Sequence, residues 1–166
     1  MRERRGVGGD RLGVPRRACP RSGRSKLQAR DTGRAMSQEN VEIVRSLLVA
    51  LNRGDFDAAF KDAAVGAEAD LSRAVGLDRS VYSIDEFRRL AEQFDATWES
   101  VRYGFEEVID AGDYVVTPFA NRLAGRDGIE VLAHGTWLWE IRGGVILRLC
   151  LYQTRQEALE AVGLSE

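Results

Sequence analysis

The side chains best suited to chemistry lie near the C-terminal end of the chain, in and just after the apolar run 145–152. Arg148, Tyr152 and Thr154 are spaced by even numbers of residues, so in a strand they share one side. An arginine offers a planar positive fork to a carboxylate or enolate, and a tyrosine offers a phenol donor. The opposite side holds a valine and three leucines, so both sides are largely apolar. Alternation therefore leaves open whether the Arg148 side faces a ligand pocket or a dimer interface.

The three tryptophans form a second group of candidates. Trp137 and Trp139 share one face of the strand that precedes the turn 142–144, and this turn joins two apolar strands into a β-hairpin. Trp98 continues the apolar face of a predicted helix. Such aromatic side chains form either a ligand-stacking wall or core, and both interpretations stand because core and pocket share a face in a bent sheet.

The remaining histidine and cysteine candidates point away from metal or nucleophilic chemistry. His134, the single histidine, shares a strand face with Thr136 and two glutamates, and we interpret it as a surface or interface residue. Cys19 and Cys150 lack metal-ligand spacing and exclude a disulfide framework as an organising feature. We expect Cys150 to be a small core or pocket residue, and we predict no metal site and no cofactor.

Charge divides the chain into two parts. Residues 1–35 carry a net charge of +8, whereas residues 36–166 carry −10. The acidic part is a poor nucleic-acid binder, because phosphate contacts require a basic surface. Residues 1–35 have little apolar periodicity, so we expect a disordered basic extension that precedes the true initiator, Met36. The alternative is a basic arm that binds nucleic acid or another partner.

Length and hydropathy predict one domain at residues 36–166. The chain has 166 residues, 44% of them hydrophobic, which suffices for a single domain with a real core. No run approaches the roughly 20 apolar residues of a membrane span. Arginine pairs stand at 4–5 and 16–17, but neither is followed by the apolar stretch of an export signal. We therefore expect a cytoplasmic protein that does not bind membranes.

Helical patterns fill the first half of this domain. Ser37 can cap a helix that runs to Leu51, and Asp55 can cap a second helix that reaches 65–66. The segment 67–71 alternates like a brief strand. Ser83 and Glu86 then make a capping box for a third helix, whose apolar face ends at Trp98.

Four strand patterns follow, and short turns join them into an antiparallel meander. The predicted strands are 101–109, 114–124, 129–141 and 145–152, and 155–162 is a last short helix. Pro118 cannot donate to a ladder, so we expect it at a bulge or a strand edge. The order predicts an α+β fold in which a strongly bent antiparallel sheet carries all helices on one side. Such a cone has an interior that can hold a small ligand.

Several short segments carry a resemblance to the nuclear transport factor 2-like superfamily, and within it to the SnoaL-like, or polyketide cyclase-like, group. The matching segments are Asn-Arg-Gly-Asp-Phe-Asp at 52–57, Ile-Asp-Ala-Gly-Asp at 109–113, Trp139 with Arg142 and Gly144, Arg148 with Tyr152, and Glu-Ala-Leu-Glu-Ala at 157–161. The resemblance covers the whole domain and none of residues 1–35. It implies a cone-shaped α+β barrel, a homodimer formed through the sheet, and a pocket between sheet and helices.

The resemblance also implies positions for catalytic groups. Ketosteroid isomerases use an aspartate at the end of the first strand as base, which corresponds to Asp70 here, but their oxyanion-hole positions fall on Leu47 and Trp137. The SnoaL-type cyclases place an acid where this chain has Thr154, and a threonine hydroxyl cannot carry the proton. The acid–arginine–acid relay of limonene-epoxide hydrolases has no convincing match.

The function predicted on these grounds is the binding of a small, largely apolar organic molecule. The predicted lining is Trp98, Trp137, Trp139, Arg148, Tyr152 and Thr154, and Asp70 is the one candidate base. Whether the protein is an enzyme is left open; any activity implied by the resemblance would be cofactor-free, of the isomerase, cyclase or hydrolase type. The alternative is a non-catalytic dimerisation or ligand-sensing module that works through its apolar sheet face.

Overall fold

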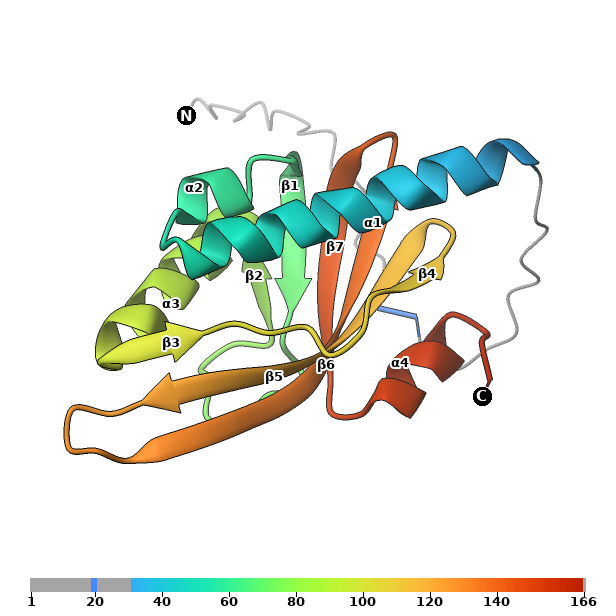
Figure 1. Cartoon of the computed structure of the whole chain (residues 1–166). Coiled ribbons are helices and arrows are strands. Elements are labelled where there is room, and N and C mark those ends of the chain that lie inside the picture. Colours follow the sequence, from blue (N-terminus) through green and yellow to red (C-terminus); the bar gives the residue numbers. More distant parts are fainter. Residues whose placement is uncertain (1–18, 21–30, 166) are drawn as a thin grey trace, which may run out of the picture.

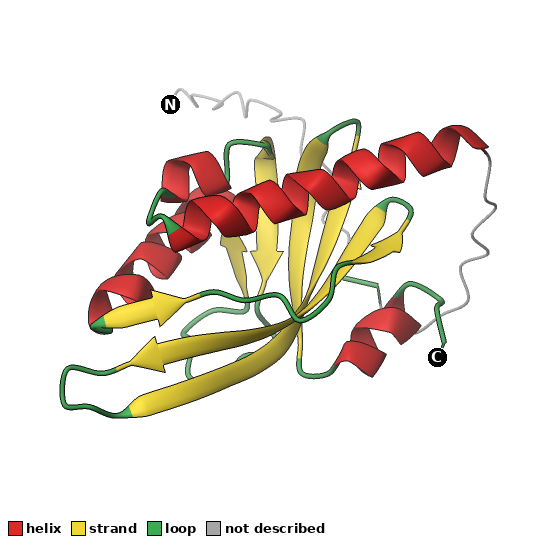
Figure 2. Ribbon diagram, in the orientation of Figure 1, coloured by secondary structure: helices red, strands yellow, loops and turns green. Residues whose placement is uncertain are grey.

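A computed structural model of the chain describes residues 19–20 and 31–165 (Figure 1). Its elements follow the order α1 (Asp31–Asn52), α2 (Phe56–Ala59), β1 (Ala63–Asp70), β2 (Val81–Ser83), α3 (Ile84–Thr97), β3 (Ser100–Arg102), β4 (Ile109–Ala111), β5 (Tyr114–Ala124), β6 (Glu130–Arg142), β7 (Val145–Tyr152) and α4 (Arg155–Ala161). The predicted α+β class is confirmed: a bent, unclosed sheet carries four helices (Figure 2). Most of residues 1–35 lie outside the described residues, so the expected disorder and the domain boundary at residue 36 stay predictions.

The sheet has seven strands and is not purely antiparallel. Its order is β2-β1-β7-β6-β5-β3, and β4 pairs with the other end of β5. The predicted meander β5-β6-β7 is present, but β1 joins β7 in a parallel pair, with Ala69 opposite Leu149. A parallel pair needs a long connection between its strands, and here α3 and the strands that follow it lie between β1 and β7 along the chain. Local turn patterns in the sequence do not reveal such a pairing.

The first two helices differ in length from the prediction. α1 begins at Asp31 rather than at Ser37, whose side chain is buried. α2 ends at Ala59, and the chain enters β1 at Ala63 instead of remaining helical to residue 66. Backbone bonding explains the early end: the amide of Ile146 on β7 donates to the carbonyl of Asp62, which draws this segment into the sheet.

The capping box predicted for the third helix is confirmed. The Ser83 hydroxyl accepts from the Glu86 amide, and the Glu86 carboxylate accepts from the Ser83 amide at 2.9 Å. These reciprocal bonds satisfy two backbone donors that a helix start otherwise leaves unpaired. They fix the start of α3, the helix that covers one end of the sheet.

The strand predicted for residues 101–109 is instead two short strands, β3 and β4, that pair with opposite ends of β5. Pro118 lies on β5 in the gap between them, where the Glu106 amide donates to its carbonyl oxygen. Because proline lacks an amide hydrogen, this is a position where a regular ladder cannot continue. The proline thus marks the change of partner along β5.

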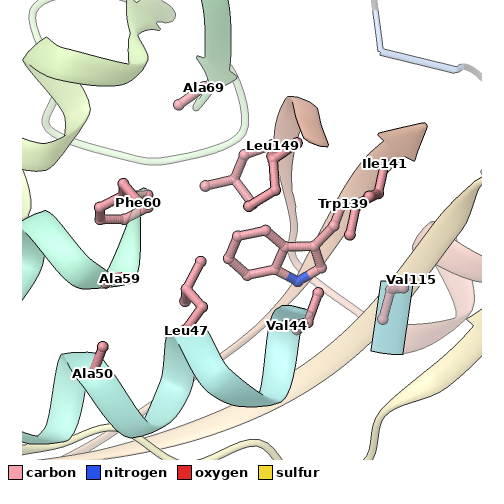
Figure 3. Close-up of a cluster of buried hydrophobic side chains, with 11 residues drawn as sticks. Val44, Leu47, Ala50, Ala59, Phe60, Ala69, Val115, Trp139, Ile141 and Leu149 are labelled. Carbon is pink, nitrogen blue, oxygen red and sulfur yellow. The ribbon is translucent and has the colours of Figure 1, made fainter. Parts of the chain in front are cut away.

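The main core lies between α1 and the inner, concave face of the sheet. Trp139 is its largest member, and Figure 3 shows the indole between Val44 and Leu47 of α1 and Leu149 of β7. The indole Nε1 donates to the Thr117 hydroxyl at 2.8 Å, so this buried polar atom is satisfied. Trp139 therefore acts mainly as core.

A second cluster covers the outer face of the sheet, which corrects the expectation that all helices lie on one side. Leu138 and Cys150 point to this face and pack with α4. Cys19 lies there too and forms a disulfide with Cys150, and the Tyr152 hydroxyl donates to the Pro20 carbonyl at 2.7 Å. The pairing was not expected from the sequence, because a separation of 131 residues carries no local signal.

Candidate functional site

A cavity of about 350 Å³ lies between α3 and the concave face of the sheet. The residues that line it come from α1, the end of α2, α3, the β1–β2 loop, the loop between β3 and β4, and the strands β5, β6 and β7. They are Leu51, Phe60, Leu71, Ala74, Leu77, Phe87, Leu90, Ala91, Phe94, Tyr103, Phe105, Phe119, Asn121, Ala133, His134, Trp137, Trp139, Leu149 and Leu151. Eight of them are Phe, Tyr or Trp, so aromatic rings dominate the wall.

Strand alternation decides which side chains reach the cavity. On β6 the odd-numbered residues face inward, and this brings Trp137 and Trp139 to the lining. Their partners on β7 are Leu151 and Leu149, so the leucine side of that strand faces the cavity. The Arg148 side of β7 therefore faces away from this cavity, and its predicted role in a dimer interface stays a prediction.

Trp137 stands at the centre of the aromatic wall. Its ring packs against Phe87 of α3 in an edge-on contact with centroids 5.7 Å apart, and stacks on Phe119 of β5 at 5.8 Å. The ring centroids of Trp137 and Trp139 are 6.3 Å apart. Such arrangements of aromatic rings are attractive and rigid, and they leave ring faces and edges available to a bound molecule.

Gly135 makes room for this wall. A Cβ atom at this position would lie 2.6 Å from Cζ of Phe119 and 2.8 Å from its Cε1, closer than real contacts allow. Phe119 is Gly135's partner across the β5–β6 ladder. The absent side chain thus lets the Phe119 ring lie flat over β6, next to Trp137.

The polar part of the lining is small and uncharged. No Asp, Glu, Lys or Arg is among the described residues that line the cavity. Tyr103 donates its hydroxyl hydrogen to Oδ1 of Asp95 at 3.3 Å, and burial, followed by the negative charge of Asp95, raises the pKa of Tyr103. Asn121 accepts from the Gly104 amide through Oδ1 at 3.2 Å. His134 is at an even-numbered position of β6, so its side chain leaves the strand on the face opposite Trp137, and the residue is exposed.

Three residues predicted to bind the ligand lie on the far side of β7 or beyond its end. Arg148 forms an ion pair with Glu68 of β1, at 2.7 Å, on the outer face. Tyr152 packs under the guanidinium of Arg73, with 4.1 Å between the Arg73 Cζ and the ring centroid. Thr154 caps α4, where its hydroxyl accepts from the Glu157 amide. All three are engaged in holding the fold and stand outside the cavity lining.

The other two predicted residues also lie outside the lining. Asp70 pairs in register with Cys150, which places it toward the outer face, and its Oδ1 accepts from the Ser72 amide at 3.0 Å in a tight turn. Trp98 ends α3 and packs beside Phe94, with ring centroids 6.2 Å apart. Of the residues nominated from the sequence, the structure brings only Trp137 and Trp139 together at the cavity.

The wall opposite the tryptophans is not among the residues predicted from the sequence. Phe119 and Asn121 alternate correctly on a predicted strand, and the cross-strand register with β6 would have placed them beside Trp137 and Ala133. Tyr103 and Phe105 gave no usable signal, because the pattern assigned them to a continuous strand that is in fact a loop.

Neither a scan against known protein families nor a search of curated proteins finds a match to this chain. Solved structures do match it. A nuclear transport factor 2-like protein from Burkholderia thailandensis is 22% identical, with a TM-score of 0.59 over 73% of this chain and 95% of its own. A putative polyketide cyclase from Xanthomonas campestris is 20% identical, with a TM-score of 0.55 over 76% of this chain and 98% of its own.

A third match supports the same class. A hypothetical protein with a ketosteroid isomerase-like fold from Catenulispora acidiphila, solved in complex with trimethylamine, is 19% identical, with a TM-score of 0.57 over 75% of this chain and 94% of its own. The chain therefore has the nuclear transport factor 2-like fold. At these identities the likeness defines the fold, and the function has to come from the site itself.

Two further observations bear on the site's chemistry. Within residues 19–20 and 31–165, no group of three or more His, Cys, Asp or Glu side chains is arranged to hold a metal ion. In the same ranges no helix combines the length and apolar character needed to cross a bilayer.

Proposed function

We propose that this protein binds a small, uncharged, predominantly aromatic organic molecule in the cavity between α3 and the sheet. The observation that carries the proposal is the composition of the wall: eight aromatic side chains surround about 350 Å³ of space, and no carboxylate, ammonium or guanidinium lines it among the described residues. Concave, mostly apolar cavities of this size are typical of small-molecule sites.

The absence of charge at the wall favours a neutral ligand. Burial of a neutral polar group without a hydrogen-bond partner costs about 2–7 kcal/mol in lost hydration. Burial of an unpaired charged group costs more. An apolar ring system has no such cost and gains from burial at roughly 25 cal/mol per Å². Ring contacts with Trp137, Phe87 and Phe119 add geometric selectivity for flat molecules.

The same composition favours binding without proton transfer. A general base must lie within hydrogen-bond reach of the proton that it removes, and the lining contributes no carboxylate. Asp70, the base implied by the family resemblance, is occupied by the Ser72 amide on the other side of β1. A SnoaL-like ligand-binding protein without catalytic acid is the function that these residues support best.

The proposal is tested by two dyes with one aromatic skeleton. N-phenyl-1-naphthylamine is neutral, and 1-anilinonaphthalene-8-sulfonate is its sulfonated, anionic counterpart. Fluorescence titration of the full chain with each dye should show the neutral dye binding at least about tenfold more tightly, equivalent to 1.4 kcal/mol. Equal affinities, or preference for the anion, would contradict an uncharged site.

The predicted cytoplasmic location and the homodimer formed through the sheet are part of the same proposal. The outer sheet face near α4 is covered within the chain by Cys19, Ala158 and Leu159. A dimer that uses the sheet would therefore have to form on the parts that α4 leaves uncovered.

A further inference from the structure

The cavity wall has one polar corner, formed by Tyr103 and Asn121. Both residues line the cavity. They are adjacent through Gly104, whose amide donates to Asn121 Oδ1 at 3.2 Å while its carbonyl accepts from the Ala120 amide at 2.9 Å. Of the other lining residues, His134 and Trp137 also carry ring N–H groups, and the indole nitrogen of Trp139 is already bonded to Thr117; the rest contribute apolar side chains.

Tyr103 is held in place at both its backbone and its side chain. The Asn52 side chain at the end of α1 donates to the Tyr103 carbonyl at 2.8 Å and accepts from the Tyr103 amide at 2.9 Å. The hydroxyl donates to Asp95 of α3. Two helices, α1 and α3, thus hold one tyrosine, and a binding residue is typically held in place in this way.

These bonds determine what each polar group still offers. The Tyr103 hydroxyl hydrogen is committed to Asp95, so its oxygen is left as a hydrogen-bond acceptor. Oδ1 of Asn121 is committed to Gly104, and among the described residues Nδ2 of Asn121 has no acceptor, so this amide is left as a donor. The corner therefore presents one donor and one acceptor, both uncharged.

We infer that Tyr103 and Asn121 form a recognition subsite for a hydroxyl group carried by the aromatic ligand. A hydroxyl both accepts and donates, which matches the amide donor of Asn121 and the acceptor oxygen of Tyr103. The inference rests on the proposed function and narrows it, from any neutral aromatic molecule to a phenol or aryl alcohol.

The energetic consequence is selectivity rather than raw affinity. A neutral hydrogen bond contributes about 0.5–1.5 kcal/mol in net terms, so two bonds correspond to a gain of about tenfold or more over the ligand that lacks the hydroxyl. A ligand with an ether oxygen retains only the acceptor function and should gain less.

The experiment uses naphthalene, 2-methoxynaphthalene and 2-naphthol as matched probes, with displacement of N-phenyl-1-naphthylamine from the full chain as the readout. We expect 2-naphthol to bind about tenfold more tightly than naphthalene, with 2-methoxynaphthalene between them. Tyr103→Phe should reduce the advantage of 2-naphthol to that of 2-methoxynaphthalene. Tyr114→Phe is the matched control, because it removes the same hydroxyl group from a tyrosine on the outer face. It should preserve the ratio of the 2-naphthol and naphthalene affinities.

The outcomes separate the inference from the function on which it rests. If naphthalene and 2-naphthol bind equally, or if Tyr103→Phe and Tyr114→Phe change the ratio alike, the cavity binds aromatic molecules but the subsite is refuted. If none of the three probes displaces the dye and the dye itself does not bind, the proposed function fails and the subsite with it.

Discussion

Gly135 shapes the cavity although it has no side chain. Its missing side chain accommodates the Phe119 ring, and that ring in turn stacks on Trp137. The shape of the aromatic wall thus depends on a missing side chain, which a search for reactive groups does not reveal. At the residue scale, the site is made by space and ring contacts, and Tyr103 and Asn121 are the polar side chains from which we infer ligand recognition.

Replacing Gly135 with alanine should therefore destabilise the protein. In an ordinary strand this change is mildly favourable, but here the new methyl group would force Phe119 from its position, at a cost of about 1–3 kcal/mol. Urea unfolding of Gly135→Ala against the parent chain measures the difference.

A second background makes the Gly135 prediction specific. In a chain that already carries Phe119→Leu, the atoms that would clash, Cζ and Cε1, are absent. The same Gly135→Ala change should then cost much less in free energy of unfolding. An equal cost in both backgrounds would show that Phe119 is not the cause.

The residue-scale predictions from the sequence divide along a physical line. Trp137 was found because strand alternation is a local property, readable from the spacing of apolar residues. Arg148 and Tyr152 were nominated because their side chains can do chemistry, but β7 is apolar on both sides, and only its neighbours decide which side is interior. Asp70 is implied by the family resemblance, which carries no information on the turn that its carboxylate forms with the Ser72 amide.

At the scale of elements, the best predictions were those encoded by neighbouring residues. The capping box of α3 needs only Ser83 and Glu86, three residues apart, and it was foreseen. The early end of α2 and the split between β3 and β4 were not, because both follow from bonds to distant strands, such as that between Ile146 and Asp62. The β5–β6–β7 meander was predictable since short turns join consecutive strands.

Thr154, which the sequence suggests as a ligand-binding residue, has a structural role as the N-cap of α4. Its hydroxyl accepts from the Glu157 amide, and the Glu157 carboxylate accepts from the Thr154 amide, which together form a capping box. Thr154→Ala should cost about 1 kcal/mol in free energy of unfolding, whereas Thr154→Ser should retain most of it, because serine caps equally well. Thermal or urea unfolding of the two variants checks this.

The binding data from the same two variants distinguish a cap from a ligand contact. Because Thr154 lies outside the cavity lining, both variants should bind N-phenyl-1-naphthylamine with the parent affinity. Loss of dye binding in Thr154→Ala without loss of stability would show that Thr154 contacts the ligand, and would contradict a role as a helix cap alone.

The whole molecule has two faces with different roles. The concave face, covered by α1 and α3, contains both the main core and the cavity, and the outer face carries α4 together with Cys19 and Pro20 (Figure 1). Every residue of the cavity lining lies at or after Leu51. Of the N-terminal residues that the structure describes, Cys19, Pro20 and the start of α1 lie outside this lining.

The bent sheet explains why the fold was predictable and its chemistry was not. A strongly curved sheet with helices across its concave face encloses space whatever residues line it, so patterning of apolar residues suffices to predict the architecture. What the space binds depends on side chains from eight separate segments, among them Tyr103 and Phe119, that meet only after folding.

The central claim is that ligands enter the space between α3 and the sheet, and blocking that space tests it most directly. Ala91 lines the cavity from α3, and Ala96, five residues further along the same helix, is exposed and outside the lining. Fluorescence titration with N-phenyl-1-naphthylamine compares Ala91→Phe with Ala96→Phe, both checked for retained secondary structure. The account predicts that Ala91→Phe weakens binding by about tenfold or more while Ala96→Phe stays within about twofold of the parent chain. Equal affinities for the two variants would place the binding site elsewhere and contradict the account.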